Sequence, residues 1–409
     1  MQAHRIRRAI IAAFLSVLPP FAIPAPLYAQ EQTTPIKIVV LTDMSGAYSA
    51  LSGRGAVEAA KMAVEEFGGT VLGRPVEVVS VDHRNNAPEA AAKAREAFDA
   101  GAELALDVTN SGAALAVSAV AKEKHKLEIV TGAASSALTG SACSKYTYLY
   151  AYDTYSFAAS TGRSIAGERD GKTWYGIVPN YAFGQQMLAD FTTAVQSQGG
   201  RFVHSDMIPI GTADFSSYLL AAQNSHAQVL GVLNAGTDTV NTMKQVKQFG
   251  IDKHMRVAIG LLYITDVDAL PDVFVGSRIT TSWYWNEDKR ARAWADRFTK
   301  RMGGGLRPSQ VQAADYSAAT QWLKAVKAAG SVDADKVVAN LDGRRFDDIF
   351  AHNAQWRARD HQVTHDMYVV DVVPKEALKE PHAWYKVVSA IPASRAFRPE
   401  SESTCKKDW

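Results

Sequence analysis

Cysteine is scarce in this sequence, because only Cys143 and Cys405 occur among 409 residues, and neither lies in a spacing that binds zinc. His361 and His365 are four residues apart, but this spacing suits a metal only on a helix, and the adjoining apolar run is typical of a strand. The enzyme motif Gly-x-Ser-x-Gly is also absent. We therefore expect no metal, no cofactor and no enzymatic activity.

Blocks of one charge are absent as well. The chain has 44 lysines and arginines against 42 acidic residues, and no basic run that would bind the phosphates of a nucleic acid. We expect no nucleic acid as a partner.

Residues 1–29 differ from the rest of the chain. Arg5, Arg7 and Arg8 precede a short apolar run and a proline-broken stretch that ends at Ala29. This order predicts a secretory signal peptide, and the run is too short and too broken to span a bilayer well. Its removal would leave 41 basic and 42 acidic residues. No cysteine follows the leader, so we expect a periplasmic protein without a lipid anchor.

The expected export of the chain makes a disulfide bond between its two cysteines possible. In an oxidising compartment two cysteines pair more often than not, so we expect a disulfide between Cys143 and Cys405, with two separate thiols as the alternative. The bond would join the end of the chain to its first half and close a very long loop.

Apolar, β-branched segments alternate with helical patterns along the first half of the chain. Strands without polar alternation, separated by helices, indicate a parallel sheet covered on both faces. The expected strands are 36–41, 76–81, 104–109 and 127–130, and the expected helices are 56–67, 88–98 and 113–124.

The same order restarts near residue 173. "NSG" at 110–112 and "NAG" at 234–236 follow corresponding strands, which favours two lobes of like plan. The expected strands are 173–178, 228–233, 256–260, 277–285 and 365–373, and the expected helices are 184–195, one after Asp214, 289–302 and 308–329.

We expect an α/β fold of two doubly wound parallel-sheet lobes, joined by three crossover segments near 147–155, 280–288 and 345–365. The first lobe would comprise 36–150 and about 286–348, and the second 151–285 and about 349–390. Residues 391–409 would form a C-terminal tail.

In such sheets ligands bind outside the carboxyl ends of the strands. Six polar or small loops lie at these ends and would face one cleft. The stretch "LTDMSGAYSALSGRG" (41–55) begins the series, but "GRGAVE" lacks the third glycine of a dinucleotide loop, and the stretch has no Gly-Lys-Ser/Thr. Aromatic residues at these loops and at the crossovers predict a pocket for an apolar or planar ligand; the candidates are Tyr48, Tyr152, Tyr155, Tyr181, Phe183, Tyr263 and Trp283.

Several segments in order resemble the type I periplasmic solute-binding proteins of ABC importers, in the branch of the branched-chain amino-acid receptors. The resemblance rests on "TDMSGAYSALSGRGAVEAAKMAVEEFGG", "NSGAALAVSAVAKEKHK", "TGAASSALTG", "NYAFGQQM", "QFG", "ADYSAATQWLKAVKAAG" and "HDMYVVDV". It implies lobes that close over a small molecule, which a permease in the inner membrane then receives. We expect the receptor to be a monomer.

The resemblance also implies roles for individual residues. Loops of the first lobe would hold a ligand carboxylate, Tyr48 or Ser52 would line the pocket, and Asp153 or Tyr155 would stand where an acid meets a ligand ammonium. Asn234, Tyr152, Phe183 and Tyr263 complete the expected lining, and the carboxylate-binding residues would be Asn110, Ser111, Ala133 and Ser135.

One departure from the family bears on the ligand. A second acid normally follows the strand that ends at Gly260, but this chain has "LLYI" (261–264), which includes Leu262. A buried ammonium without a carboxylate partner costs several kcal/mol. We therefore expect an aromatic or other organic acid; the alternatives are a branched-chain or other amino acid, or a ligand-sensing regulator of the same fold.

Overall fold

A computed structural model describes residues 34–407 and 409, so the predicted signal peptide lies outside the described residues. The first lobe contains a six-stranded sheet in the order β2-β3-β1-β4-β5-β6, parallel except for the β2–β3 pair. Its strands are β1 (Ile36–Thr42), β2 (Thr70–Val71), β3 (Arg74–Asp82), β4 (Ala102–Asp107), β5 (Leu127–Val130) and β6 (Thr147–Leu149).

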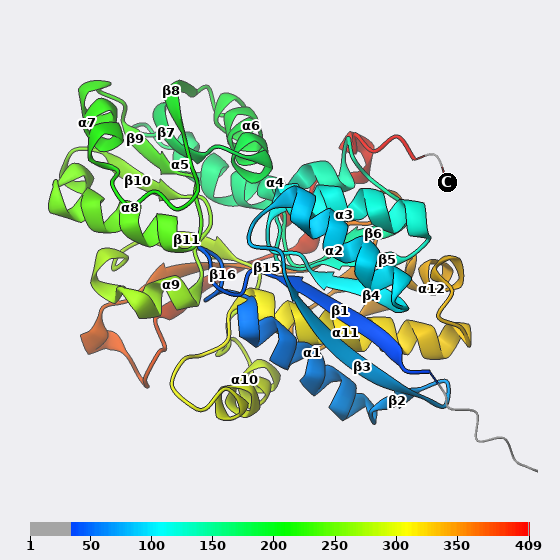
Figure 1. Cartoon of the computed structure of the whole chain (residues 1–409). Helices are drawn as coiled ribbons and strands as arrows, with labels where there is room; N and C mark the ends of the chain where they lie inside the picture. The colour runs from blue at the N-terminus through cyan, green and yellow to red at the C-terminus, as the bar shows by residue number, and fades with distance from the viewer. Residues whose placement is uncertain (1–33, 408) are drawn as a thin grey trace, which may run out of the picture. The chain divides into compact units, whose positions relative to one another are not determined.

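Helices cover both faces of this sheet (Figure 1). On one face α1 packs against α11, with buried alanines such as Ala56, Ala59 and Ala60 allowing a close approach, and on the other face α2 packs against α3. These helices are α1 (Gly53–Phe67), α2 (Ala87–Asp99), α3 (Ser111–Lys124), α10 (Lys289–Arg301), α11 (Gln310–Ala329) and α12 (Ala334–Leu341).

The second lobe contains a parallel sheet in the order β10-β9-β7-β8. Its strands are β7 (Thr173–Pro179), β8 (Arg201–Ile208), β9 (Val229–Val232) and β10 (Arg256–Ile259). The surrounding helices are α4 (Thr154–Phe157), a π-helical turn at Ala158–Gly162, α5 (Arg163–Gly167), α6 (Ala182–Gln196), α7 (Ser216–Asn224), α8 (Thr237–Gln248) and α9 (Ile264–Ala269).

Two small antiparallel sheets follow. One has the order β11-β15-β16 and the other the order β12-β13-β14. Their strands are β11 (Arg278–Thr281), β12 (Arg345–Phe346), β13 (Ala354–Trp356), β14 (Val363–Thr364), β15 (Met367–Val372) and β16 (Tyr385–Ile391), and α13 (Ala393–Ala396) follows.

The expected α/β class and the order of the long helices and strands are confirmed. One strand was predicted too long, because β11 ends at Thr281 instead of continuing to Trp285. The Oε1 atom of Gln310 accepts hydrogen bonds from Ser282 N at 2.8 Å and from Thr281 Oγ1 at 2.6 Å, and so holds the chain away from strand pairing. The exact bounds of the two lobes remain predictions.

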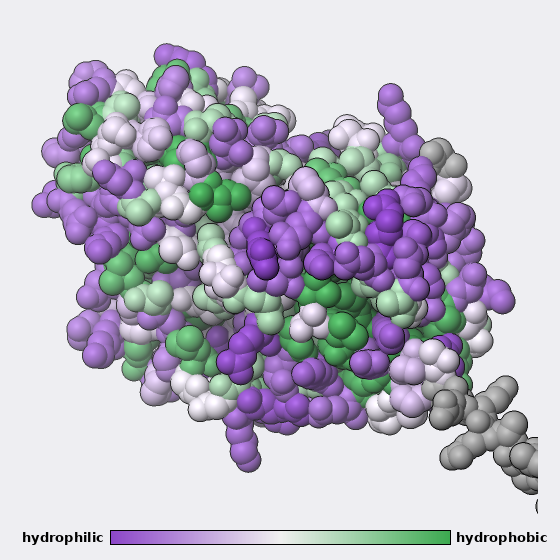
Figure 2. All heavy atoms as spheres, in the orientation of Figure 1, coloured by the Kyte–Doolittle hydropathy of each residue, from purple (hydrophilic) through white to green (hydrophobic). Residues whose placement is uncertain are grey.

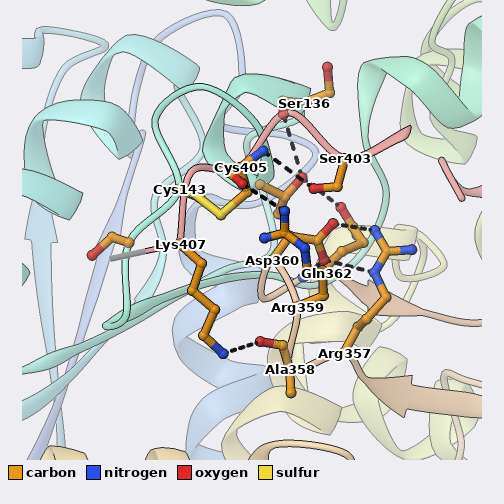
Figure 3. Close-up of a disulfide and its surroundings, with 12 residues drawn as sticks. Ser136, Cys143, Arg357, Ala358, Arg359, Asp360, Gln362, Ser403, Cys405 and Lys407 are labelled. Carbon is orange, nitrogen blue, oxygen red and sulfur yellow. Dashed lines mark hydrogen bonds and ion pairs between the residues drawn. A yellow bond between two sulfur atoms is a disulfide. The ribbon is translucent and has the colours of Figure 1, made fainter. Parts of the chain in front are cut away.

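The C-terminal segment is tied to the first half of the chain by the expected disulfide. The Cα atoms of Cys143 and Cys405 are 5.6 Å apart, and the bond closes 262 residues (Figure 3). The neighbouring segment 357–359 holds the same tail, since Arg359 donates to the Cys405 carbonyl at 3.0 Å and Lys407 donates to the Ala358 carbonyl at 2.9 Å.

The visible surface over the helices is mainly hydrophilic, and apolar side chains show between them where the sheets lie (Figure 2). Among the residues described, no helix is both long and apolar enough to cross a bilayer.

The disulfide gives a test of the fold. Replacing Cys143 and Cys405 by serine should lower the free energy of unfolding by about 2–5 kcal/mol, because the unfolded chain regains the freedom of a very long loop. Denaturant titration followed by circular dichroism would measure this change. Reductant should destabilise the wild type to the same extent and leave the double variant unaffected; equal midpoints for the oxidised wild type and the double variant would contradict the role of the bond.

Candidate ligand-binding site

A cavity lies where the two lobes meet, at the carboxyl ends of their parallel strands. Its empty space, part of which is open to solvent, is about 230 Å³. Residues from six loops line it, and each loop follows one of the strands β1, β4, β5, β7, β9 and β10. They are Tyr48, Leu51, Thr109, Ser111, Gly132, Ala134, Tyr181, Phe183, Ala235, Leu261 and Tyr263.

The strand ends present these loops because the chain turns sharply there. After β4, Asp107 and Val108 have φ angles of 78° and 47°, in the left-handed region that non-glycine residues rarely adopt. The Val108 N–H donates to the Leu41 carbonyl at 2.8 Å, which fixes the turn against the end of β1. Thr109 and Ser111 are thereby directed to the cavity.

Tyrosine hydroxyls join the two lobes across the cavity. The hydroxyls of Tyr48, from the first lobe, and Tyr181, from the second, are 2.6 Å apart. Tyr152, at the first crossover, donates to the Gly132 carbonyl at 3.1 Å, and its hydroxyl lies 2.8 Å from that of Tyr263. Burial raises the pKa of all four tyrosines, so the hydroxyls stay neutral.

Ser111 presents a hydrogen-bond donor to the cavity. Its Oγ accepts the backbone N–H groups of Ala134 at 3.3 Å and Ser135 at 3.2 Å. A serine hydroxyl accepts two hydrogen bonds and donates one, so these two contacts leave the hydroxyl hydrogen for a ligand. Ser111 is also the first residue of α3, where the positive end of the helix dipole favours an anion.

Other residues predicted for the site support the loops instead of lining the cavity. The Asn110 side chain accepts from Gly112 N at 2.9 Å and from Ala113 N at 3.1 Å. The Asp153 carboxylate caps α4 through Ser156 N at 2.7 Å. In the second lobe Asn234 bonds to the hydroxyls of Thr239 and Thr242, both at 2.9 Å.

The remaining predicted residues are buried in the same region or directed elsewhere. Ser52 bonds to Thr42 Oγ1 at 2.8 Å and to the Asp107 carboxylate. Ala133, Ser135 and Leu262 are buried but outside the cavity lining, and Ser135 Oγ has no hydrogen-bond partner among the described residues. Their roles in binding stay predictions.

Two aromatic residues expected near the ligand lie against other groups. The Arg398 guanidinium stacks over the Tyr155 ring at 4.3 Å. The indole N–H of Trp283 donates to the Ile349 carbonyl at 2.7 Å, and its ring packs edge-on against Trp294. Residue order alone did not reveal Arg398 and Ile349, which come from segments far along the chain.

Sequence reasoning missed part of the lining and one buried acid. Leu51, Thr109, Ala134 and Ala235 were not singled out, although each lies next to a predicted loop residue. Asp266 follows "LLYI" and accepts from Tyr263 N at 3.1 Å, and burial raises its pKa to about 7. Its position in the first turn of α9, three residues after Tyr263, is the N-capping pattern that could have revealed it.

A larger hollow of about 1070 Å³ lies between β10 and β11. Its charged side chains are already paired: Arg256 lies on Glu168, Lys247 lies 2.8 Å from Asp252, and Arg278 lies 2.7 Å from Asp371. The inter-lobe cavity is therefore the candidate ligand site. Within 34–407 and 409, no group of three or more histidine, cysteine or acidic side chains could hold a metal ion.

Two α/β lobes that close on a cavity at their strand ends define a solute-binding protein of the two-lobed type. The family model of periplasmic binding proteins matches residues 35–377, and the chain belongs to this family. A comparison with curated protein sequences found no match.

Solved structures agree with this assignment. A periplasmic binding protein from Burkholderia mallei is 45% identical, with a TM-score of 0.88 over 91% of this chain and 98% of its own. A branched-chain amino-acid ABC transporter periplasmic ligand-binding protein from Burkholderia xenovorans is 38% identical, with a TM-score of 0.80 over 91% and 99%. A solute-binding protein from Rhodopseudomonas palustris, solved with benzoate, is 18% identical with a TM-score of 0.79 over 91% and 100%, which shows the fold alone.

The buried Asp266 leads to a pH-dependent prediction. A carboxyl whose pKa is raised on folding holds its proton more tightly in the native state, so its destabilising effect grows between pH 4 and pH 7 and is complete above pH 7. Asp266→Asn keeps an acceptor for Tyr263 N and should stabilise the protein at pH 8 by about 1–4 kcal/mol. The gain should vanish at pH 4.

Thermal unfolding of both proteins across this pH range would measure the gain. The exposed Asp272 provides the control, because Asp272→Asn should show no such trend. A constant difference between Asp266→Asn and the wild type at all pH values would contradict the assignment.

Proposed function

We propose that this protein is the periplasmic substrate-binding component of an ABC importer, and that it captures a small aromatic carboxylate between its lobes and delivers it to a membrane permease. It acts as a monomer and performs no covalent chemistry. The family and its similar structures, which are solute-binding proteins, support the general role.

The observation that carries the choice of ligand is the chemistry of the cavity lining. None of the described residues that line it is charged, and four are aromatic: Tyr48, Tyr181, Phe183 and Tyr263. Transfer of an ammonium group into such surroundings is costly without a carboxylate partner. A flat, uncharged ring would instead fill the space between the aromatic side chains.

The carboxylate of the ligand would lie at the first lobe. The free hydroxyl hydrogen of Ser111 and the positive end of α3 stabilise a negative charge without a cationic side chain. The closed cavity has room for about one water molecule, so the lobes must open and the lining side chains must shift to admit a ring.

A branched-chain amino acid is the second candidate, and Asp266 is the observation that favours it. This buried carboxyl accepts the backbone N–H of Tyr263, a residue of the lining, and a shift of that loop would bring it to a ligand ammonium. The name of the Burkholderia xenovorans relative points the same way.

A ligand panel separates the two candidates. Calorimetric titration of benzoate, 4-hydroxybenzoate and leucine should give binding for at least one of the aromatic acids and none for leucine. At about 100 times its Kd, the bound acid should add roughly 2.7 kcal/mol to the free energy of unfolding. Tight leucine binding without binding of either acid would overturn the proposed ligand class.

Substitution of Tyr181 tests the aromatic wall. Tyr181→Ala should weaken benzoate binding by about tenfold or more, because it removes a ring contact and the hydroxyl partner of Tyr48. Tyr181→Phe keeps the ring and should have a smaller effect. Tyr218→Ala, in α7 away from the cavity, serves as the control and should bind as the wild type does. Equal affinities for Tyr181→Ala and Tyr218→Ala would refute the placement.

A further inference from the structure

Helix α8 of the second lobe begins without a capping side chain of its own. Gly236 precedes it, and glycine has no side-chain atom to accept the free N–H groups of the first turn. The Thr237 N–H donates instead to the carbonyl of Ala47 at 3.2 Å, and Thr237 Oγ1 donates to the same carbonyl at 3.3 Å. Ala47 belongs to the loop after β1, so the first lobe supplies the cap for a helix of the second.

The contact depends on glycine at position 236. Its φ of 60° lies in the left-handed region, and a Cβ atom there would stand 2.5 Å from the Ala47 oxygen and 3.0 Å from Tyr48 Cδ1. Any side chain would therefore keep the two lobes apart at this point. The residue that leaves α8 uncapped is also the one that lets the first lobe approach.

The backbone of the capping loop is held by a carboxylate of the first lobe. The Asp43 carboxylate accepts from Gly46 N at 2.7 Å, Tyr48 N at 2.9 Å and Asn85 Nδ2 at 2.6 Å. Because all three donors belong to the first lobe, these bonds do not require the second lobe. The Ala47 carbonyl is thus held in place before the lobes meet.

We propose that the Ala47 carbonyl and the Thr237 N–H form a latch that caps α8 only when the lobes are closed. On opening, water replaces Thr237 N and Oγ1 as partners of the Ala47 carbonyl, and closing restores both inter-lobe hydrogen bonds at the positive end of the helix. The latch favours the closed state for any ligand that the cleft accepts. The latch proposal rests on the proposed function in one respect, because both require that the lobes close on a ligand.

Thr237→Pro tests the latch directly. Proline is well tolerated at the first position of a helix, and here it removes both donors to the Ala47 carbonyl, the N–H and the threonine hydroxyl, without breaking the helix. Loss of these inter-lobe bonds should raise the Kd for benzoate about 5- to 20-fold. The rise should appear mainly in the dissociation rate, because the ligand meets the open cleft and the latch acts afterwards. Ala334→Pro, at the same position of α12 in the first lobe, is the matched control and should bind as the wild type does.

Hydrogen exchange of the wild type gives a second readout that needs no variant. Saturation with benzoate should slow exchange of the Thr237 amide. Wild-type affinity and dissociation rate in Thr237→Pro, or unchanged exchange of this amide, would overturn the latch. If the wild type binds leucine instead of benzoate, the proposed ligand class is wrong, and the same measurements with leucine test the latch. If the wild type binds benzoate tightly but Thr237→Pro changes neither affinity nor dissociation rate, the latch is wrong and the proposed function stands.

Discussion

The two lobes of this protein meet at the ligand cavity through neutral hydroxyls. Tyr48 pairs with Tyr181, and Tyr152 with Tyr263, and burial keeps all four protonated. Salt screens surface ion pairs but has little effect on hydrogen bonds between neutral hydroxyls. The contribution of these tyrosine pairs to lobe closure should therefore not change with ionic strength. They also leave the cavity without a fixed charge, which restricts the ligands that it can accept.

The acidic side chains near the cavity bond to the lining residues but do not line the cavity themselves. Asp107 accepts from Thr109 Oγ1 at 3.0 Å and bonds to Ser52, and Asp266 accepts from Tyr263 N. Burial raises the pKa of both carboxyls, to about 6 and about 7. These acids fix the loops that carry the lining residues, while the surface presented to the ligand consists of rings, hydroxyls and small side chains. In this account, a carboxylate ligand brings the one full charge into the closed cavity.

The sequence was sufficient for the parts of the fold that depend on local pattern. Unalternating apolar runs between helices identified both parallel sheets, and the loops at their strand ends are the ones that line the cavity. Contacts between individual side chains could not be predicted from the sequence in the same way. Arg398, more than 200 residues later, stacks on the ring of Tyr155, a partner that the sequence did not indicate, and the expected role of Tyr155 at the ligand stays a prediction. Trp283 was expected on a strand, but Gln310 ends that strand at Thr281. Such outcomes depend on which distant segments meet, and no local pattern encodes that.

In the proposed function, the uncharged lining of the inter-lobe cavity selects an aromatic carboxylate over a ligand that carries an ammonium group. Mass spectrometry of small molecules released from the protein after gentle purification from its native periplasm tests this claim most directly. We expect an aromatic monocarboxylic acid in a one-to-one ratio with the protein. Recovery of leucine or another amino acid in that ratio would contradict it.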